Sequence, residues 1–208
     1  MSVHRCAKVD RKTKETDISI SVDLDGVGSS TIDTKIPFFD HMLDAFSRHS
    51  LIDMDLRVDG DIEVDAHHSV EDAGIVLGCA IKEALGDKVG ITRFGSFALP
   101  MDEALILCSL DISGRGQLFW DEDIPVDAIS TFDTQLAKEF FVALASNAGI
   151  TLHLQQLAGE NAHHLIEATF KACGRALRQA LEIDPRVSNV LPSTKGALLW
   201  ELWSQIAA

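Results

Sequence analysis

The chain contains 208 residues, of which 46% are hydrophobic and 24% charged, a composition typical of a globular protein with one ordinary domain or two small ones. Its 18 Lys and Arg against 32 Asp and Glu give a formal charge of −14, which opposes general binding to nucleic acid. No apolar run is long enough to cross a bilayer, and the charged segment 1–15 is unlike a secretory signal, so we expect a cytoplasmic protein without a membrane partner.

In the first half of the chain, hydrophobic spacing predicts strands followed by helices. The sequence allows an N-terminal strand at 3–10, and alternating apolar residues predict a strand over 18–24 that ends in a turn. A helix is expected at 40–46, a strand at 51–60 and a long amphipathic helix at 67–85.

The second half repeats this order of elements. A strand is expected at 102–111, a helix at 138–144, a strand at 150–157 and a second long amphipathic helix at 163–181. The glycine-containing stretch 86–90 separates the two halves.

An internal duplication explains this repetition. The pattern His-His-x-x-Glu occurs at 67–71 and again at 163–167, 96 residues later, and upstream segments match at separations of 88 and 98. We therefore predict an α+β fold built from a duplicated strand-strand-helix-strand-helix unit, with two mainly antiparallel sheets and helices packed between them. The first repeat is expected at 1–90, the second at 91–192 and a C-terminal segment and tail at 193–208.

The duplicated pattern predicts a metal site. On a helix, His67, His68 and Glu71 are three or four residues apart and project from one end, and adjacent imidazoles point in different directions. A single histidine pair could equally lie on the surface or in the core, but two copies at matching positions favour metal binding. Imidazole and carboxylate donors without thiolate suit Mn, Fe, Co, Ni or Zn. The second copy supplies His163, His164 and Glu167.

Three further residues extend this set. His41 is the obvious additional ligand, and its repeat partner is Glu139, which is either an oxygen ligand or a solvated helix position. His153 lies in an apolar strand and is expected to be a buried histidine or to support a ligand through a hydrogen bond.

Several cations and hydroxyls predict an anion site despite the acidic total. Lys171 follows Glu167 by one helical turn, whereas its repeat partner is the apolar Ile75. Lys171 could be a solvated lysine, but a charge present in only one copy indicates a specific role. Arg93, Arg115 and the hydroxyl-rich run 192–196 suit a phosphate monoester.

These motifs together resemble those of the imidazoleglycerol-phosphate dehydratases of histidine biosynthesis. The resemblance extends from about residue 5 to about residue 200, but no recognised motif lies in the ending 197–208, where Trp200 and Trp203 suggest a short helical packing face. The matching motifs are Phe39-Asp40-His41-Met42-Leu43, Asp65-Ala66-His67-His68-Ser69-Val70-Glu71-Asp72, Arg93-Phe94-Gly95, Asp111-Ile112-Ser113-Gly114-Arg115, Gly159-Glu160-Asn161-Ala162-His163-His164-Leu165-Ile166-Glu167 and Pro192-Ser193-Thr194-Lys195-Gly196.

The resemblance implies a lyase that dehydrates imidazole glycerol phosphate to imidazole acetol phosphate with two Mn²⁺ per site. It also implies self-association as a 24-subunit cage with metal sites shared between chains. The eighth ligand of the family is often a histidine, and the aligned Glu139 departs from that pattern. The implied metal ligands are His41, His67, His68, Glu71, Glu139, His163, His164 and Glu167. The expected substrate and phosphate contacts are Glu15, His41, His49, Arg93, Arg115, Lys171, Ser193, Thr194 and Lys195.

The chemistry requires loss of a hydrogen that is barely acidic. We hypothesise that a metal holds the substrate ring as an imidazolate, which expels the adjacent hydroxyl to form a diazafulvene and makes the neighbouring C–H acidic. Glu15 is the expected proton shuttle, with a metal-bound water as the alternative. The expected catalytic set is Glu15, His67, Glu71, His163 and Glu167.

Two other functions use the same residues. A metal-assisted hydrolase of a small phosphate ester would release inorganic phosphate instead of forming a ketone. A metal-joined assembly without catalysis would lose its oligomeric state with the metal and bind no small molecule. The anion site disfavours the second alternative.

Overall fold

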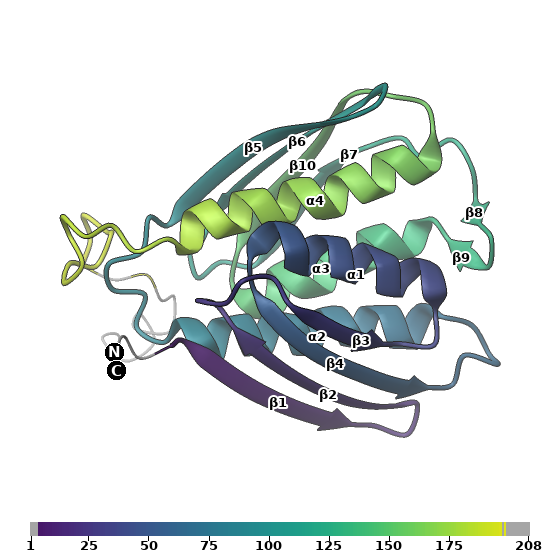
Figure 1. Cartoon of the computed structure of the whole chain (residues 1–208), viewed down its shortest axis with the longest axis horizontal. Coiled ribbons are helices and arrows are strands. Elements are labelled where there is room, and N and C mark those ends of the chain that lie inside the picture. Colours follow the sequence, from purple (N-terminus) through teal and green to yellow (C-terminus); the bar gives the residue numbers. More distant parts are fainter. Residues whose placement is uncertain (1–3, 197, 199–208) are drawn as a thin grey trace, which may run out of the picture.

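Two four-stranded sheets enclose a layer of four helices in the computed structural model, which describes residues 4–196 and 198 (Figure 1). The first sheet has the spatial order β1 (Cys6–Lys12), β2 (Thr16–Asp23), β4 (Asp53–Gly60) and β3 (Ser30–Asp33). The second has the order β5 (Phe94–Met101), β6 (Ala104–Asp111), β10 (Thr151–Ala158) and β7 (Gln117–Asp121). The helices are α1 (Pro37–Ser50), α2 (His67–Leu85), α3 (Gln135–Ala148) and α4 (Ala162–Leu181), and a short pair, β8 (Ala128–Ile129) and β9 (Phe132–Asp133), precedes α3.

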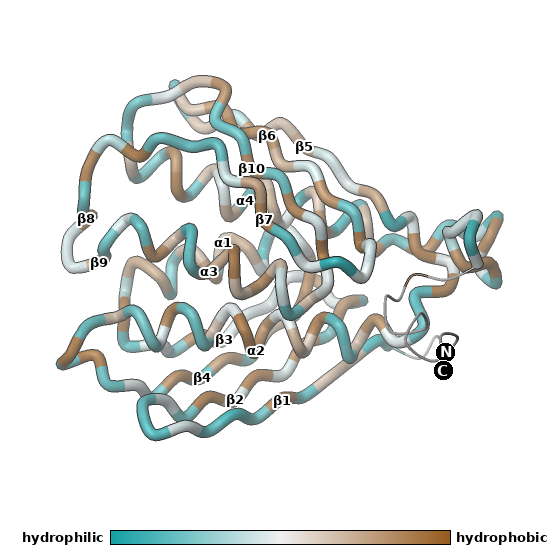
Figure 2. Tube along the Cα trace, turned by 180° about the vertical axis from the view of Figure 1, so that it is seen from behind, coloured by the Kyte–Doolittle hydropathy of each residue, from teal (hydrophilic) through white to brown (hydrophobic). Residues whose placement is uncertain are grey.

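Both sheets have the same topology. In each, the first strand pairs antiparallel with the second, the second pairs antiparallel with the strand that follows a helix, and one edge strand is parallel (β3 on β4, β7 on β10). The predicted α+β fold with two mainly antiparallel sheets and intervening helices is confirmed. Figure 2 shows hydrophobic and hydrophilic residues alternating along the strands, as expected for sheets with one face against the helices.

The helices pack as two crossing pairs, and each pair contains one helix from each half of the chain. A Cβ atom on Gly78 of α2 would lie 2.8 Å from the carbonyl oxygen of Leu144 in α3. A Cβ atom on Gly174 of α4 would lie 2.8 Å from the carbonyl oxygen of Phe46 in α1. Gly78 and Gly174 are 96 residues apart and Phe46 and Leu144 are 98 apart, as in the sequence repeat. The duplication therefore extends to the close approach of the helix backbones.

A shared aromatic core connects the two halves. Phe39 of α1 packs edge-to-face on Phe140 of α3 at 5.4 Å between ring centroids, and Phe140 stacks on Phe170 of α4 at 5.1 Å. All three side chains are fully buried. Aromatic burial of this kind is a large part of the stabilising free energy of a small core.

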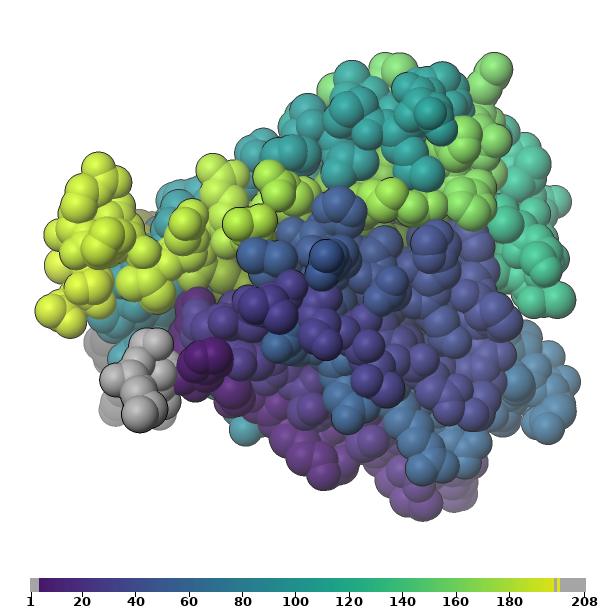
Figure 3. Space-filling model, viewed as in Figure 1, coloured from purple at the N-terminus to yellow at the C-terminus, as the bar shows by residue number. Residues whose placement is uncertain are grey.

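The N-terminal ends of the four helices lie at one end of the molecule, on the right in Figure 1. The segment 182–196 follows α4 and projects from the opposite end, in yellow in Figure 3. Helices α1 and α4 lie side by side on the face shown there. No helix among the described residues is long and apolar enough to span a membrane.

Candidate active site

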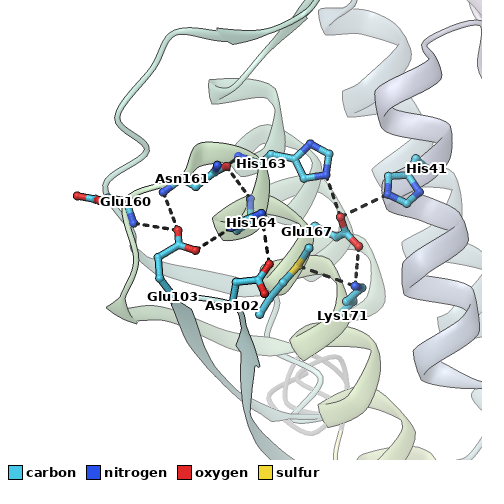
Figure 4. A network of polar contacts seen from close by, with 10 residues as sticks. His41, Asp102, Glu103, Glu160, Asn161, His163, His164, Glu167 and Lys171 are labelled. Atoms are coloured by element: carbon cyan, nitrogen blue, oxygen red, sulfur yellow. Dashed lines mark hydrogen bonds and ion pairs between the residues drawn. The ribbon is translucent and has the colours of Figure 1, made fainter.

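Three predicted metal ligands meet where α1 passes the first turns of α4. The Nε2 atoms of His41 and His163 lie 3.4 and 3.0 Å from the same carboxylate oxygen of Glu167 (Figure 4). Among residues 4–196 and 198, this is the only group of three or more His, Cys, Asp or Glu whose ligand atoms all lie within 4.8 Å of one another. Two imidazoles and a carboxylate suit a divalent transition metal, so the donor set fits such an ion.

The start of α4 is fixed by its N-cap. The side-chain oxygen of Asn161 accepts hydrogen bonds from the backbone N–H groups of His163 and His164 at 3.0 and 3.2 Å. The two imidazole rings then stand 86° apart in adjacent positions of the first turn. The cap thus directs the two histidines to different sides of the helix end.

Glu167 is nearly buried, with a side chain only 8% exposed, and is held by cations. Burial opposes ionisation of this carboxyl, but Lys171, His163 and His41 together lower the pKa of Glu167 below its ordinary value. The Lys171 Nζ atom lies 2.5 Å from Glu167 Oε1, one helical turn away. Glu167 can therefore offer an ionised carboxylate oxygen as a metal ligand, and the ammonium group of Lys171 lies beside it.

His164 points away from this group and toward the turn between β5 and β6 (Figure 4). Its Nδ1 atom lies 2.7 Å from Glu103 Oε2, and its Nε2 atom lies 3.6 Å from the exposed carboxylate of Asp102. The hydrogen bond from His164, with backbone N–H groups including that of Asn161, lowers the pKa of Glu103 to about 2. The same hydrogen bond raises the pKa of His164.

The first copy of the motif has the same ring geometry in a more open setting. The rings of His67 and His68 stand 89° apart, and His68 Nδ1 lies 3.1 Å from both carboxylate oxygens of Asp61. That hydrogen bond raises the pKa of His68. His67 and Glu71 are 3.7 Å apart and more than 40% exposed, and His67 borders a cavity of about 360 Å³.

The structure therefore unites only part of the predicted ligand set within one chain. His67, His68 and Glu71 form no group with His41, His163 and Glu167 in the described part of the chain, and the half-buried Glu139 on α3 joins no such group either.

The predicted phosphate contacts divide into two sets. At the C-terminal end of α4, the guanidinium of Arg93 donates to both carboxylate oxygens of Asp111 at 2.7 and 3.1 Å and to the Pro192 carbonyl oxygen at 2.8 Å. Arg115 lies 3.9 Å from the same Asp111. The run Ser193, Thr194 and Lys195 follows Pro192 at this end of the molecule.

Lys171 and His49 form the other set, beside the Glu167 group. Burial, together with the charges of Lys171 and Arg175, lowers the pKa of His49. The backbone N–H of Arg93 donates to the carbonyl oxygen of Ala180, nine residues beyond Lys171 on α4. Nine helical residues span about 13 Å, so the two sets lie at different positions along α4.

Glu15 occupies the exposed turn between β1 and β2. Its carbonyl oxygen accepts from the N–H of Asp61 at 3.1 Å, and its charge contributes to the raised pKa of His68. The predicted proton shuttle is thus adjacent to the first histidine pair.

Two contacts differ from the sequence analysis. His153 is exposed on the outer face of the second sheet, because the side chains of residues 151, 153 and 155 all point to that face. Its ring stacks on that of Phe119 at 4.3 Å between centroids. The expectation of a buried or ligand-supporting histidine is therefore wrong. The carboxylates of Asp61 and Glu103 beside the histidines were not predicted. A usable signal existed for Glu103, since the repeat aligns it with Glu15.

The sequence matches the family model described as imidazoleglycerol-phosphate dehydratase over residues 34–177. The chain belongs to this family. Curated imidazoleglycerol-phosphate dehydratases from Dinoroseobacter shibae and Jannaschia sp. are 59% and 56% identical over 194 residues, which are 93% of this chain and the whole of each relative.

Solved dehydratase structures share the fold. The enzyme from Staphylococcus aureus superposes with a TM-score of 0.79 at 38% identity and covers 86% of this chain and 99% of its own. The Pyrococcus furiosus protein, in complex with (S)-C348, has a TM-score of 0.79 at 43% identity over 91% of this chain and all of its own. Membership of the dehydratase family confirms the prediction of a lyase.

Proposed function

We propose that this chain removes water from imidazole glycerol phosphate to give imidazole acetol phosphate in histidine biosynthesis, in the cytoplasm and with two Mn²⁺ per site. The observation that carries the proposal is the convergence of His41, His163 and Glu167, three ligands required by the family resemblance, from helices of both repeats.

The residues of both motifs and their flanking positions would hold the two ions. Bound divalent cations would supply Lewis acidity to the substrate ring, which favours its ionised form and loss of the neighbouring hydroxyl through a diazafulvene. The proposed metal ligands are His41, His67, His68, Glu71, Glu139, His163, His164 and Glu167.

Glu15 would move the proton of the substrate C–H. Its side chain has no hydrogen-bond or ion-pair partner among the described residues, so its carboxylate is available to a ligand. Its position beside Asp61 and His68 would bring it close to an ion held by the first motif. A carboxylate that comes within hydrogen-bond reach of the substrate C–H could act as the general base or acid.

A complete site would require more than one copy of the chain. The backbone of Arg93 meets α4 at Ala180, about 13 Å along the helix from Lys171, farther than a single phosphate group reaches. The ligands of the two motifs are also separate within one chain. Closed self-association, as in the 24-subunit cage implied by the resemblance, would bring one end of a copy to the helix N-termini of another.

The proposal is tested by assaying the purified protein with imidazole glycerol phosphate before chelation, after chelation and after addition of Mn²⁺. We expect a ketone product that disappears on chelation and returns with Mn²⁺. Release of inorganic phosphate without a ketone would instead support a hydrolase. Sedimentation of the same three samples reports whether the ions also join the copies.

A further inference from the structure

Each repeat contains a carboxylate that holds the second histidine of its pair. In the second repeat Glu103 Oε2 lies 2.7 Å from His164 Nδ1, and in the first repeat both oxygens of Asp61 lie 3.1 Å from His68 Nδ1. A carboxylate only accepts, so Nδ1 carries the proton in both rings. Nε2 of His164 lies 3.6 Å from the exposed Asp102 carboxylate, beyond hydrogen-bond distance, so in both rings the Nε2 lone pair can bind a ligand. A partner of this kind fixes both the tautomer and the ring direction of a metal-binding histidine.

The two carboxylates occupy different positions in their repeats. Glu103 lies in the turn between β5 and β6, whereas Asp61 follows β4. The repeat partner of Glu103 is Glu15, in the turn between β1 and β2. The second repeat therefore uses this turn glutamate to hold a histidine, and the first repeat uses Asp61 for that task.

Glu103 is also tied to the backbone that begins α4. Its Oε1 accepts from the N–H of Asn161 at 2.9 Å and from that of Glu160 at 3.5 Å (Figure 4). Both oxygens are thus occupied, and the carboxylate connects a strand turn to the helix start and to the imidazole. Glu15 has no such side-chain contacts among the described residues.

We propose that Glu103 and Asp61 are positioning residues that present Nε2 of His164 and His68 to a divalent cation, and that Asp61, by holding His68, frees Glu15 to act on the substrate. The proposal rests on the proposed function for the identity of that cation. It divides the equivalent turn glutamates between two tasks: support of a ligand in one repeat and proton transfer in the other.

The test is a Mn²⁺ titration of the full-length, metal-depleted protein, with unbound Mn²⁺ measured by electron paramagnetic resonance. We expect Glu103→Ala and Asp61→Ala each to weaken Mn²⁺ binding by roughly 10–100-fold. Glu103→Gln keeps a single acceptor oxygen, which can serve Nδ1 or the backbone N–H groups but not both, and is expected to recover only part of the loss. The matched control Glu160→Gln changes an exposed carboxylate in the same loop and should bind as the unmodified protein does.

A second variant separates positioning from helix stability. Asn161→Ala removes the cap of α4 and is expected to lower Tm by about 2–4 °C, yet to weaken Mn²⁺ binding much less than Glu103→Ala does. Visible spectra of the Co²⁺-loaded proteins should change for Glu103→Ala and not for Glu160→Gln, because a displaced imidazole alters the ligand field. Unchanged Mn²⁺ affinity in Glu103→Ala, or equal losses in Asn161→Ala and Glu103→Ala, overturns the proposal. Dehydration by the unmodified protein tests the proposed function separately.

Discussion

The two copies of the histidine motif share a backbone and differ in what surrounds them. In both, the paired rings are nearly perpendicular at 6.2 Å between centroids. The glutamate of the second copy, Glu167, is 8% exposed and lies beside Lys171, whereas Glu71 of the first copy is 45% exposed and has the apolar Ile75 one turn later. The glutamate of one motif is thus buried within its own chain, and the glutamate of the other is open to solvent or to a partner.

This difference shows how a duplicated scaffold acquires two tasks. The ring geometry follows from adjacent positions on a helix and is retained in both copies. The surroundings come from loops and from the neighbouring helix, which vary without changing the fold. The copies can therefore keep equivalent histidine pairs and diverge in charge and exposure.

The largest effect is expected from the turn glutamate of the first repeat. Glu15→Gln should depress kcat for dehydration by roughly 10²–10⁴-fold, the usual contribution of a general acid or base, and leave metal content unchanged. Steady-state kinetics and metal analysis of the same preparation measure both. If kcat stayed at the level of the unmodified protein, Glu15 would have no part in proton transfer.

The lysine that distinguishes the second copy should have the next largest effect. Lys171→Met removes a charge 2.5 Å from Glu167 and should raise KM by about 10–100-fold, the worth of a hydrogen bond to a charged group. The control Ile75→Met changes the equivalent position of the first repeat and should alter KM little. Equal effects at both positions would contradict a task specific to the second copy.

Substitutions of the glycines at the two helix crossings, Gly78 and Gly174, should instead lower stability equally. Gly78→Ala and Gly174→Ala each place a methyl group 2.8 Å from a backbone carbonyl oxygen and should each lower the free energy of unfolding by about 1–3 kcal/mol. Val142→Ala, on the exposed face of α3, is the control. Denaturant titration measures all three, and a clear difference between the two glycines would argue against equivalent packing.

A buried carboxyl of the second repeat predicts a smaller, pH-dependent effect. Burial raises the pKa of Glu122 from 4.5 to about 8, although Thr169 donates a hydrogen bond to it. The folded protein therefore favours the neutral Glu122 carboxyl. The contribution of this carboxyl to the free energy of unfolding is fully present below about pH 4.5 and is lost as pH rises through 8. Glu122→Gln should match the unmodified protein in acid and exceed its Tm by a margin that grows as pH rises from about 4.5 toward 8. A constant Tm difference from pH 4 to pH 8 would contradict this assignment.

Local patterns predicted most of the helices and antiparallel strands. The amphipathic spacing located α2 at 67–85 and α4 to within one residue. The first helix was predicted too short, because its first turn uses Pro37 and two aromatic residues instead of a polar cap. Strands β3, β5 and β7 were not predicted. β3 and β7 pair in parallel with strands that the fold, and not the local sequence, brings beside them.

The site was predictable in composition and not in arrangement. The spacing of His163 and Glu167 on one helix is local, so their contact followed from the sequence. The meeting of His41 with Glu167 depends on how α1 crosses α4, and the separation of Arg93 from Lys171 depends on the length of α4. These are tertiary distances that no local pattern encodes.

The paired helix crossings have an evolutionary consequence. A symmetric dimer of a half-length chain contains each subunit contact twice, because the rotation axis repeats it, and any substitution in such a dimer appears on both sides. The α1–α4 and α2–α3 crossings are the pair that such an ancestor would have made. In one fused polypeptide the two equivalent positions can differ, as Lys171 and Ile75 do here, an asymmetry that identical subunits of a homodimer cannot have.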